Sequence, residues 1–199
     1  MLFTLSACGN KNKRVNLEEN PILLKNDNPK SKKDTTLTSA PIINISDNIA
    51  LPLNIISIKD SASSSIRLSQ KLGKIYGSQL KAYMQKNKLK AVGPPMAWYK
   101  SQKAPFFFEA GIPVDKKPLK MQKGILFKRT NKTKIIIAHF YGPYTETTQA
   151  YQALKDWIKD EKKTALAPAY EIYVGDPIDK DGIAVDPYKV QTDIVIPYY

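Results

Sequence analysis

Glu171 is the residue whose type and surroundings best fit ligand chemistry in this sequence. It lies in the stretch Tyr170-Glu171-Ile172-Tyr173, where it is the one charged residue among aromatic and β-branched residues. Successive side chains of a strand point to opposite faces, so Glu171 and Tyr173 are expected on one face. A carboxylate beside aromatic rings can neutralise a bound cation while the rings supply apolar area and cation–π attraction. The alternative is a solvated strand residue, since most glutamates are exposed.

A single histidine, His139, and a single cysteine, Cys8, limit the other chemistry of the chain. Any Ser-His-Asp arrangement would have to use His139, because general-base chemistry near neutral pH usually requires a histidine. With one histidine and one cysteine, we expect no metal site, no cofactor and no disulfide within the chain. We interpret His139 as a packed, hydrogen-bonded side chain.

The elements that position Glu171 follow a strand–helix–strand–strand order that occurs twice. In the first half, residues 53–58 form an apolar, β-branched strand, and apolar residues at helical spacing predict a helix over 65–88. Gly93-Pro94-Pro95 ends this unit before strands at 96–99 and 106–114.

The second half repeats this order. It comprises a strand at 134–141, a helix over 145–161, and strands at 169–174 and 190–197. The closing strands of the two halves match, because Glu109 and Asp193 each stand four residues before a proline. We therefore predict an α+β domain of duplicated βαββ units, related by a pseudo-twofold axis. Two helices would cover an antiparallel sheet, with a cleft between the halves.

Five stretches within residues 53–199 resemble the gyrase-inhibitor-like small-molecule-binding domain, which also serves as the effector-binding domain of AraC-type and MerR-type regulators. The stretches are Tyr141-Gly142-Pro143-Tyr144, Gly93-Pro94-Pro95 with Tyr99, Glu109 to Val114, Tyr170 to Tyr173 with Asp176-Pro177, and Gln191 to Pro197. No single stretch is specific, but their order and spacing together carry the resemblance.

The resemblance implies a ligand in the cleft between the repeats, with a glutamate of the strand pattern E-x-Y facing lipophilic cations. That glutamate corresponds to Glu171. The residues expected to line the ligand site are Glu171, Tyr173, Tyr99, Trp98, Phe107, Glu109 and Tyr141. A few members of the family are hydrolases of strained cyclopropanone compounds, which leaves a catalytic Glu171 as an alternative.

The first fifty residues differ in composition from the rest. Leu5-Ser6-Ala7-Cys8 resembles a bacterial lipobox, although the apolar stretch before Cys8 is short and lacks a basic start. We expect residues 1–8 to be a truncated signal and lipobox remnant, residues 9–50 a flexible tether rich in Asn, Lys, Ser and Pro, and residues 51–199 the folded domain. The protein would then be anchored by lipid on Cys8 to the bacterial cell envelope, on the periplasmic side. It would be cytoplasmic if the lipobox is a chance match.

The chain carries a net charge of +13, and most of it belongs to residues 51–199. The lysines are scattered, and no nucleic-acid-binding motif occurs, so we expect no direct nucleic-acid binding. Three functions remain open. The first is a tethered module that senses or sequesters a small lipophilic or cationic molecule, the second is a hydrolase of small strained electrophiles that uses Glu171, and the third is a protein-binding module.

Lipidation of Cys8 is directly testable. If the lipobox is used, mass spectrometry of the protein isolated from its native host will find a diacylglyceryl-modified Cys8 as the new N-terminus. Cys8→Ser is the matched control and should remain unlipidated. An unmodified chain that still begins at Met1 would rule the anchor out.

Overall fold

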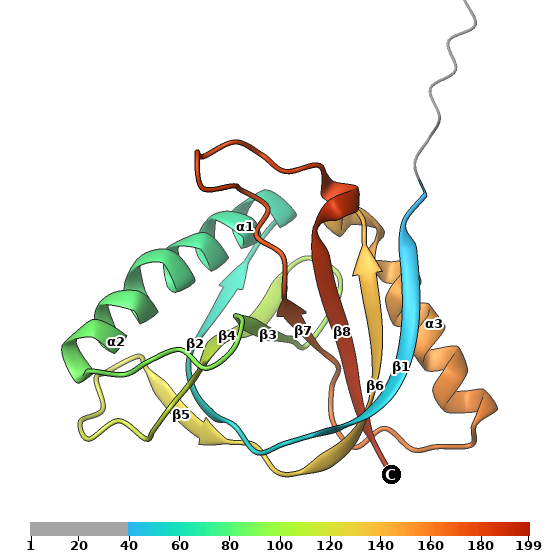
Figure 1. Ribbon diagram of the computed structural model, residues 1–199, viewed down its shortest axis with the longest axis horizontal. Coiled ribbons are helices and arrows are strands. Elements are labelled where there is room, and N and C mark those ends of the chain that lie inside the picture. The colour runs from blue at the N-terminus through green and yellow to red at the C-terminus, as the bar shows by residue number, and fades with distance from the viewer. Residues whose placement is uncertain (1–39) are drawn as a thin grey trace, which may run out of the picture. The chain divides into compact units, whose positions relative to one another are not determined.

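Residues 40–199 are the part of the chain that the computed structural model describes. Eight strands form one antiparallel sheet, and helices cover one of its faces (Figure 1). The strands are β1 Ile42–Ala50, β2 Asn54–Ala62, β3 Met96–Tyr99, β4 Phe106–Val114, β5 Leu126–Arg129, β6 Thr133–Tyr141, β7 Tyr170–Tyr173 and β8 Gln191–Tyr198. The helices are α1 Ser65–Lys74, α2 Lys81–Asn87 and α3 Thr147–Asp160. The fold class predicted from the sequence is thus confirmed.

The sheet order shows the predicted duplication. It runs β1-β6-β8-β7-β3-β4-β2-β5, so the units β2-α1-α2-β3-β4 and β6-α3-β7-β8 lie side by side and join where β7 pairs with β3. Corresponding strands keep the same register. Ile55 lies opposite Pro113 in the first unit, and Ile135 lies opposite Pro197 in the second. The two units are therefore related by a pseudo-twofold axis between β3 and β7.

Strand β1 corrects the expected start of the domain. Residues 42–50 were assigned to the tether, but they pair with β6 along their whole length, from Ile42 opposite Tyr141 to Ala50 opposite Thr133. The segment resembles a tether because its polar residues alternate with isoleucines and most of its side chains stay exposed at the sheet edge. The rest of the expected tether, and Cys8 with it, lies outside the residues that the structure describes.

The edge strands are exchanged between the two halves. Strand β1 precedes β2 in the chain but pairs with β6, while β5 precedes β6 but pairs with β2. The two connecting segments cross below the sheet (Figure 1). At the crossing the backbone N–H of Leu53 donates to the Thr130 hydroxyl at 2.8 Å, and the N–H of Thr130 donates to the Leu53 carbonyl at 2.9 Å. Each half thus completes the sheet of the other.

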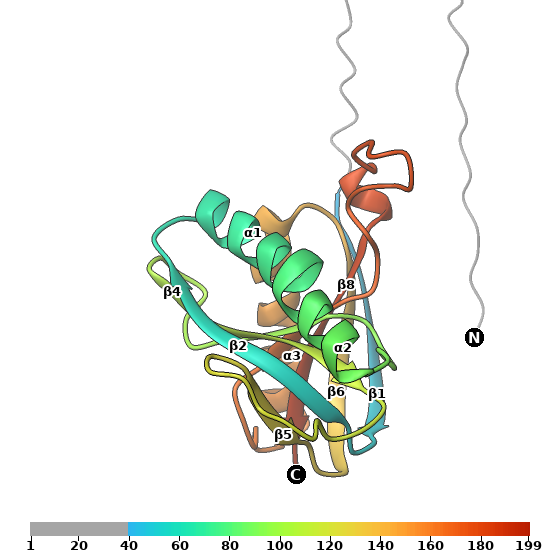
Figure 2. The same cartoon turned by 90° about the vertical axis from the view of Figure 1, so that its left-hand side faces the viewer.

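The first helical segment is continuous from Ser65 to Asn87, close to the predicted 65–88. Ser64 caps its start by accepting from the N–H of Arg67, and Lys88 ends it in the left-handed conformation. Between α1 and α2 lies a π-helical turn, Ile75–Leu80. This wider turn carries Tyr76 and lies over β4 and β2, with α1 and α2 continuing the helix on either side (Figure 2). The Tyr76 hydroxyl reaches the Met96 carbonyl of β3. Such turns often occur at functional sites.

Each half has its own apolar core on the helix-covered face. Ile75, Leu80 and Tyr83 pack on β2, β3 and β4, whereas Ala150, Tyr151 and Leu154 pack on β6 and β8. The inner strands β3 and β7 lie where the two cores meet and carry four of the seven residues predicted to line the ligand site, Trp98, Tyr99, Glu171 and Tyr173. Within residues 40–199 no helix combines the length and apolar content needed to cross a membrane.

Gly111 on β4 provides a test of the packing. An added Cβ would lie 2.9 Å from the Ile56 carbonyl oxygen and 2.9 Å from the Ile55 side chain. The carbonyl belongs to the paired strand β2 and has little freedom to move. Gly111→Ala should therefore lower the free energy of unfolding by about 1–3 kcal/mol, measured by urea denaturation.

Gly73 is the matched control. A Cβ there meets nothing within 4 Å, and the residue is in α1. Gly73→Ala should raise stability by about 0.5–1 kcal/mol, because alanine loses less backbone entropy in a helix. Equal effects at both sites would contradict this packing of β4 against β2.

Candidate functional site

Glu171 lies on β7, at the junction of the two halves, and only 5% of it is exposed. Its two carboxylate oxygens accept hydrogen bonds from two phenols. Tyr151 of α3 donates to one oxygen at 2.9 Å, and Tyr173 of β7 donates to the other at 2.9 Å. The Tyr99 and Tyr173 hydroxyl oxygens are 2.6 Å apart. A phenol has one proton, so Tyr99 donates to Tyr173 when Tyr173 donates to Glu171.

Two further tyrosines complete the surroundings of Glu171. The rings of Tyr76 and Tyr144 each meet the Tyr173 ring edge-on, with centroids 6.0 Å apart. Tyr76 is held by its hydroxyl, which donates to the Met96 carbonyl at 2.8 Å. We call Glu171 and these five tyrosines the Glu171 cluster: Tyr76, Tyr99, Tyr144, Tyr151 and Tyr173.

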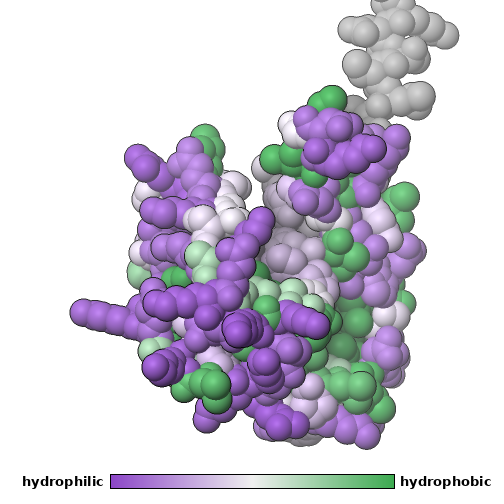
Figure 3. Space-filling model, turned by 60° about the vertical axis from the view of Figure 1, so that its left-hand side comes forward, coloured by the Kyte–Doolittle hydropathy of each residue, from purple (hydrophilic) through white to green (hydrophobic). Residues whose placement is uncertain are grey.

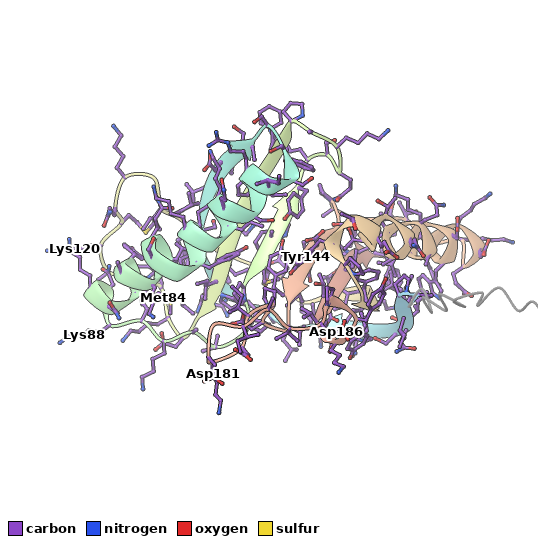
Figure 4. The ribbon with its side chains drawn as sticks, turned by 90° about the horizontal axis from the view of Figure 1, so that it is seen from above. Met84, Lys88, Lys120, Tyr144, Asp181 and Asp186 are labelled. Carbon is purple, nitrogen blue, oxygen red and sulfur yellow. The ribbon has the colours of Figure 1, made fainter. Side chains whose placement is uncertain are left out.

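The cluster lies between the helical layers of the two halves. In the view from above, Tyr144 lies between the α1 side and α3 (Figure 4). The surface is hollowed between these two lobes (Figure 3). Tyr144 is the most open member, 47% exposed, whereas Tyr99 and Tyr151 are buried. A ligand that approaches along the hollow would meet Tyr144 first.

The electrostatics of the cluster are those of a carboxyl group in an apolar site. Burial raises the pKa of Glu171, although the hydrogen bonds from Tyr173 and Tyr151 oppose the rise. Burial and the charge of Glu171 together raise the pKa of Tyr99 and Tyr151, so these phenols stay neutral. Within residues 40–199 no lysine, arginine or histidine forms an ion pair with Glu171. The charged carboxylate is therefore stabilised by phenol dipoles alone.

Of the residues predicted to line the site, the structure brings three together: Glu171, Tyr173 and Tyr99. Three members of the cluster were missed: Tyr76, Tyr144 and Tyr151. Tyr76 and Tyr151 lie among the regularly spaced apolar residues that predict the two helices, where a tyrosine is easily taken as core. The signal that could have identified them is the hydroxyl group, because a buried phenol needs a hydrogen-bond partner.

The other four predicted site residues do not belong to this cluster. Trp98, Phe107, Glu109 and Tyr141 lie on the opposite face of the sheet, because each is one residue out of phase with a strand residue that faces the helices. Phe107 is half exposed, and Tyr141 donates to the Gln191 side chain at 2.7 Å. Strand alternation places these four residues on the face away from Glu171.

The opposite face has contacts of its own. Lys128 lies 3.3 Å from the centroid of the Trp98 ring and pairs with Glu109 at 2.9 Å, and Ser57 donates to Glu109 at 2.7 Å. A cavity of about 440 Å³ lies where the two connecting segments meet, bordered by Leu53, Thr130, Trp98 and Tyr170. Glu109 is thus paired with the cationic side chain of Lys128, whereas Glu171 has no such partner among residues 40–199.

His139 on β6 is hydrogen-bonded, as predicted. Its Nδ1 lies 2.8 Å from Asp193 Oδ1, and its Nε2 lies 2.8 Å from the Ser46 hydroxyl. The residues that the structure describes include no group of three or more His, Cys, Asp or Glu side chains placed to hold a metal ion.

Solved structures with the same architecture exist. A scan against protein-family models and a search of curated proteins gave no match. The C-terminal domain of EcmrR superposes with a TM-score of 0.66 at 15% identity, over 79% of this chain and 98% of that domain. The match spans 57% of the EcmrR chain in its complex with DNA.

Two other solved structures are similar. A hydrolase from Listeria innocua matches with a TM-score of 0.56 at 14% identity, over 84% of this chain and 98% of its own. SAV2435, solved with bound tetraphenylphosphonium, matches with a TM-score of 0.51 at 15% identity, over 78% of this chain and 94% of its own. At these identities the similarity establishes the fold, which is that of gyrase-inhibitor-like effector domains.

Glu171 should make stability depend on pH in a characteristic direction. The folded state binds the Glu171 proton more tightly than the unfolded chain, so this contribution is present below the ordinary carboxyl pKa and lost as pH rises through the raised one. Glu171→Gln removes the ionisation and keeps the shape. The change in the free energy of unfolding caused by Glu171→Gln should therefore be more stabilising, or less destabilising, at pH 8 than at about pH 4. Urea denaturation of wild type and variant at both pH values measures it.

Glu109→Gln is the matched control with the opposite sign. Burial acts to raise the pKa of Glu109, but the hydrogen bonds from Lys128 and Ser57 outweigh it and lower this pKa. The charged form therefore stabilises the fold above the ordinary carboxyl pKa, and this contribution is lost as pH falls through the lowered one. Glu109→Gln should be more destabilising at pH 8 than at about pH 4. The same pH trend in both variants would contradict these environments.

Proposed function

We propose that this domain binds a small lipophilic cation at the Glu171 cluster. The observation that carries the proposal is a buried carboxylate with phenols around it and no cationic side chain paired with it among residues 40–199. A buried charge is costly unless it is paired. A bound cation would remove that cost, so the site favours a positively charged ligand over a neutral one of the same shape.

The rings determine which kind of cation fits. Tyr76 and Tyr144 meet Tyr173 edge-on, so the cluster offers aromatic surface in more than one orientation. Aromatic faces attract cations, and weakly hydrated organic cations lose little by leaving water. A quaternary phosphonium or ammonium with aromatic substituents suits this environment better than a small inorganic ion. SAV2435, which shares the fold, was solved with such a cation.

Binding would require movement of the tyrosines, because Glu171 is enclosed by them in this structure. Tyr144 is best placed to move. It is the most exposed member of the cluster and lies in a single turn of 3-10 helix, Tyr144–Glu146, before α3. Its displacement would uncover the Tyr173 ring, which Tyr144 meets edge-on and whose hydroxyl donates to Glu171. Tyr99 and Tyr173 would remain in place through their mutual hydrogen bond.

A hydrolase that uses Glu171 is the second candidate. The observation that favours it is the raised pKa of Glu171, which brings a carboxyl group closer to the range useful for general acid–base catalysis. The cluster could then activate water against a small strained electrophile. This alternative uses the same residues, so one variant tests both functions.

The sequence also leads us to propose a setting for this binding. The stretch Leu5 to Cys8 supports a lipid-anchored sensor or sequestering protein at the bacterial envelope, and no other observation bears on this anchor. The proposal for the Glu171 cluster does not depend on it.

Tetraphenylphosphonium is the probe for the proposed function. Its binding to the full chain should be detectable by isothermal titration calorimetry. Glu171→Gln should weaken it by about 10- to 100-fold, the effect of losing a charge-assisted contact of about 1.5–3 kcal/mol. Triphenylphosphine oxide, which is neutral and similar in its rings, should bind with little difference between wild type and variant.

The matched control is Glu109→Gln, which removes a carboxylate from the opposite face and should leave phosphonium binding unchanged. Equal binding of the charged and neutral probes to wild type would contradict a cation site. Loss of turnover of a strained electrophile in Glu171→Gln, with ligand binding retained, would instead support the hydrolase.

A further inference from the structure

Three side chains on the face opposite the Glu171 cluster form a continuous hydrogen-bonded chain. Ser46 is on β1, His139 on β6 and Asp193 on β8, three strands adjacent in the sheet. The Ser46 hydroxyl lies 2.8 Å from His139 Nε2, and His139 Nδ1 lies 2.8 Å from Asp193 Oδ1. Both distances are those of hydrogen bonds between a nucleophile, a base and the group that orients the base.

The chemistry of the three groups fixes the direction of these bonds. An ionised aspartate only accepts, so His139 Nδ1 carries the proton that it donates to Asp193. Neutral His139 then has a lone pair on Nε2, and the Ser46 hydroxyl donates to it. The serine proton thus already points at the nitrogen that would remove it. This is the polarity that an acyl-transfer site requires.

Further contacts hold this hydrogen-bonded chain, which we call the Ser46 relay (Ser46, His139 and Asp193), in place and leave it accessible. Gln191 donates to Asp193 Oδ1 at 2.8 Å, and Tyr141 donates to the Gln191 carbonyl oxygen at 2.7 Å. The Asp193 side chain is 12% exposed and the His139 side chain 29%. Ser46 is partly exposed on the edge strand. The orienting group is thus the most enclosed, while the nucleophile and base face the solvent.

The other half of the domain shows that the fold does not need this relay. By register, Lys59 occupies the position of His139, since each lies opposite the acidic residue of its closing strand. Leu126 of β5 corresponds in the same way to Ser46 of β1. Leu126 lies opposite Ser57, two residues before Lys59, and Ser46 lies opposite Ile137, two residues before His139. The first half is satisfied by an ion pair between Glu109 and Lys128. Ser-His-Asp is therefore particular to the second half.

The edge position of β1 provides a donor for a developing oxyanion. Within the described residues β1 pairs with β6 alone, so its other edge is free. Successive backbone N–H groups of a strand point to alternate sides. One of the Ser46 and Asp47 N–H groups therefore points away from β6. An N–H of the nucleophile or of the residue after it is a common oxyanion donor.

We propose that Ser46, His139 and Asp193 form a second reactive site, which cleaves activated carboxylic esters. The Ser46 oxygen attacks the ester carbonyl carbon while His139 Nε2 takes the hydroxyl proton. The bond to the alcohol oxygen then breaks, and His139 returns the proton to the departing alcohol. Water, deprotonated by His139 in the same way, cleaves the acyl-serine to release the carboxylic acid and restore Ser46. Asp193 acts as a positioning residue through His139.

A fluorophosphonate probe tests the nucleophile. Peptide mass spectrometry of the labelled full chain should place the phosphonyl group on Ser46, and Ser46→Ala should abolish that label. Ser101→Ala, which alters an exposed loop serine with no histidine partner, should leave it unchanged. With p-nitrophenyl butyrate, turnover should fall by about 100-fold or more in Ser46→Ala and in Asp193→Asn. Because Cys8 and lysine amines also react with such esters, the site of the label is the primary readout.

The single histidine gives a readout of the positioning role. In untagged protein, ¹⁵N NMR should show His139 protonated on Nδ1 and unprotonated on Nε2, and Asp193→Asn should shift this balance. Labelling of Ser46 no faster than Ser101 would show that the chain of hydrogen bonds is structural only, which overturns the proposal. Ester turnover that survives Ser46→Ala but not Glu171→Gln would assign the activity to the Glu171 cluster, and would also overturn it.

Discussion

A buried carboxylate stabilised by phenol hydroxyls is the constraint on which the rest of this structure depends. Glu171 lies on β7, where the two halves meet, and the tyrosines of its cluster come from both. Tyr76 and Tyr99 belong to the first unit, while Tyr151 and Tyr173 belong to the second. Tyr151 and Tyr173 donate to Glu171 and must keep their positions, because loss of either donor leaves the buried charge less compensated. Tyr99 of the first unit joins them through its hydrogen bond with Tyr173. The hydrogen bond between Tyr99 and Tyr173 thus helps to fix the separation of the two halves above the paired strands β3 and β7.

The exchange of edge strands explains how that separation is held. Two short segments cross between the halves and bond to one another through Leu53 and Thr130. These two hydrogen bonds tie the crossing segments together at one end of the sheet, while the two halves stay joined by the pairing of β3 with β7. The π-helical turn between α1 and α2 then brings Tyr76 to Tyr173 without ending the helix. The exchanged edge strands hold the two halves of the sheet together, and the π-helical turn places the Tyr76 ring against Tyr173.

The sequence predicted the repeated units because apolar periodicity is strong in both, and it placed Glu171 with Tyr173 because alternation in a strand is local information. It assigned residues 42–50 to the tether because Asn44, Ser46 and Asn48 resemble a linker, and the strand with which they pair lies some ninety residues further along the chain. Glu109 and Tyr141 were assigned to the ligand site through stretches of the resemblance, which carries no account of which face a residue occupies. The contact between Ser46, His139 and Asp193 could not be predicted either, because it forms only through the pairing of three strands that are far apart in the chain.

The charge of the whole domain sharpens the role of Glu171. Residues 51–199 carry most of a net charge of +13, so the long-range field of the protein repels a cation. Salt limits that repulsion to roughly 8 Å from the exposed lysines at physiological ionic strength. Glu171 is buried, so its attraction acts through a less polar medium and is screened far less. A cation that approaches the Glu171 cluster is therefore weakly repelled by the exposed lysines and then strongly attracted by the buried carboxylate. A strongly hydrated cation would lose its water there, and the aromatic rings do not replace it. The proposed selection of lipophilic cations would thus follow from a basic surface around one buried carboxylate, because the surface disfavours positive charge in general and the cluster favours only a cation that loses little by leaving water.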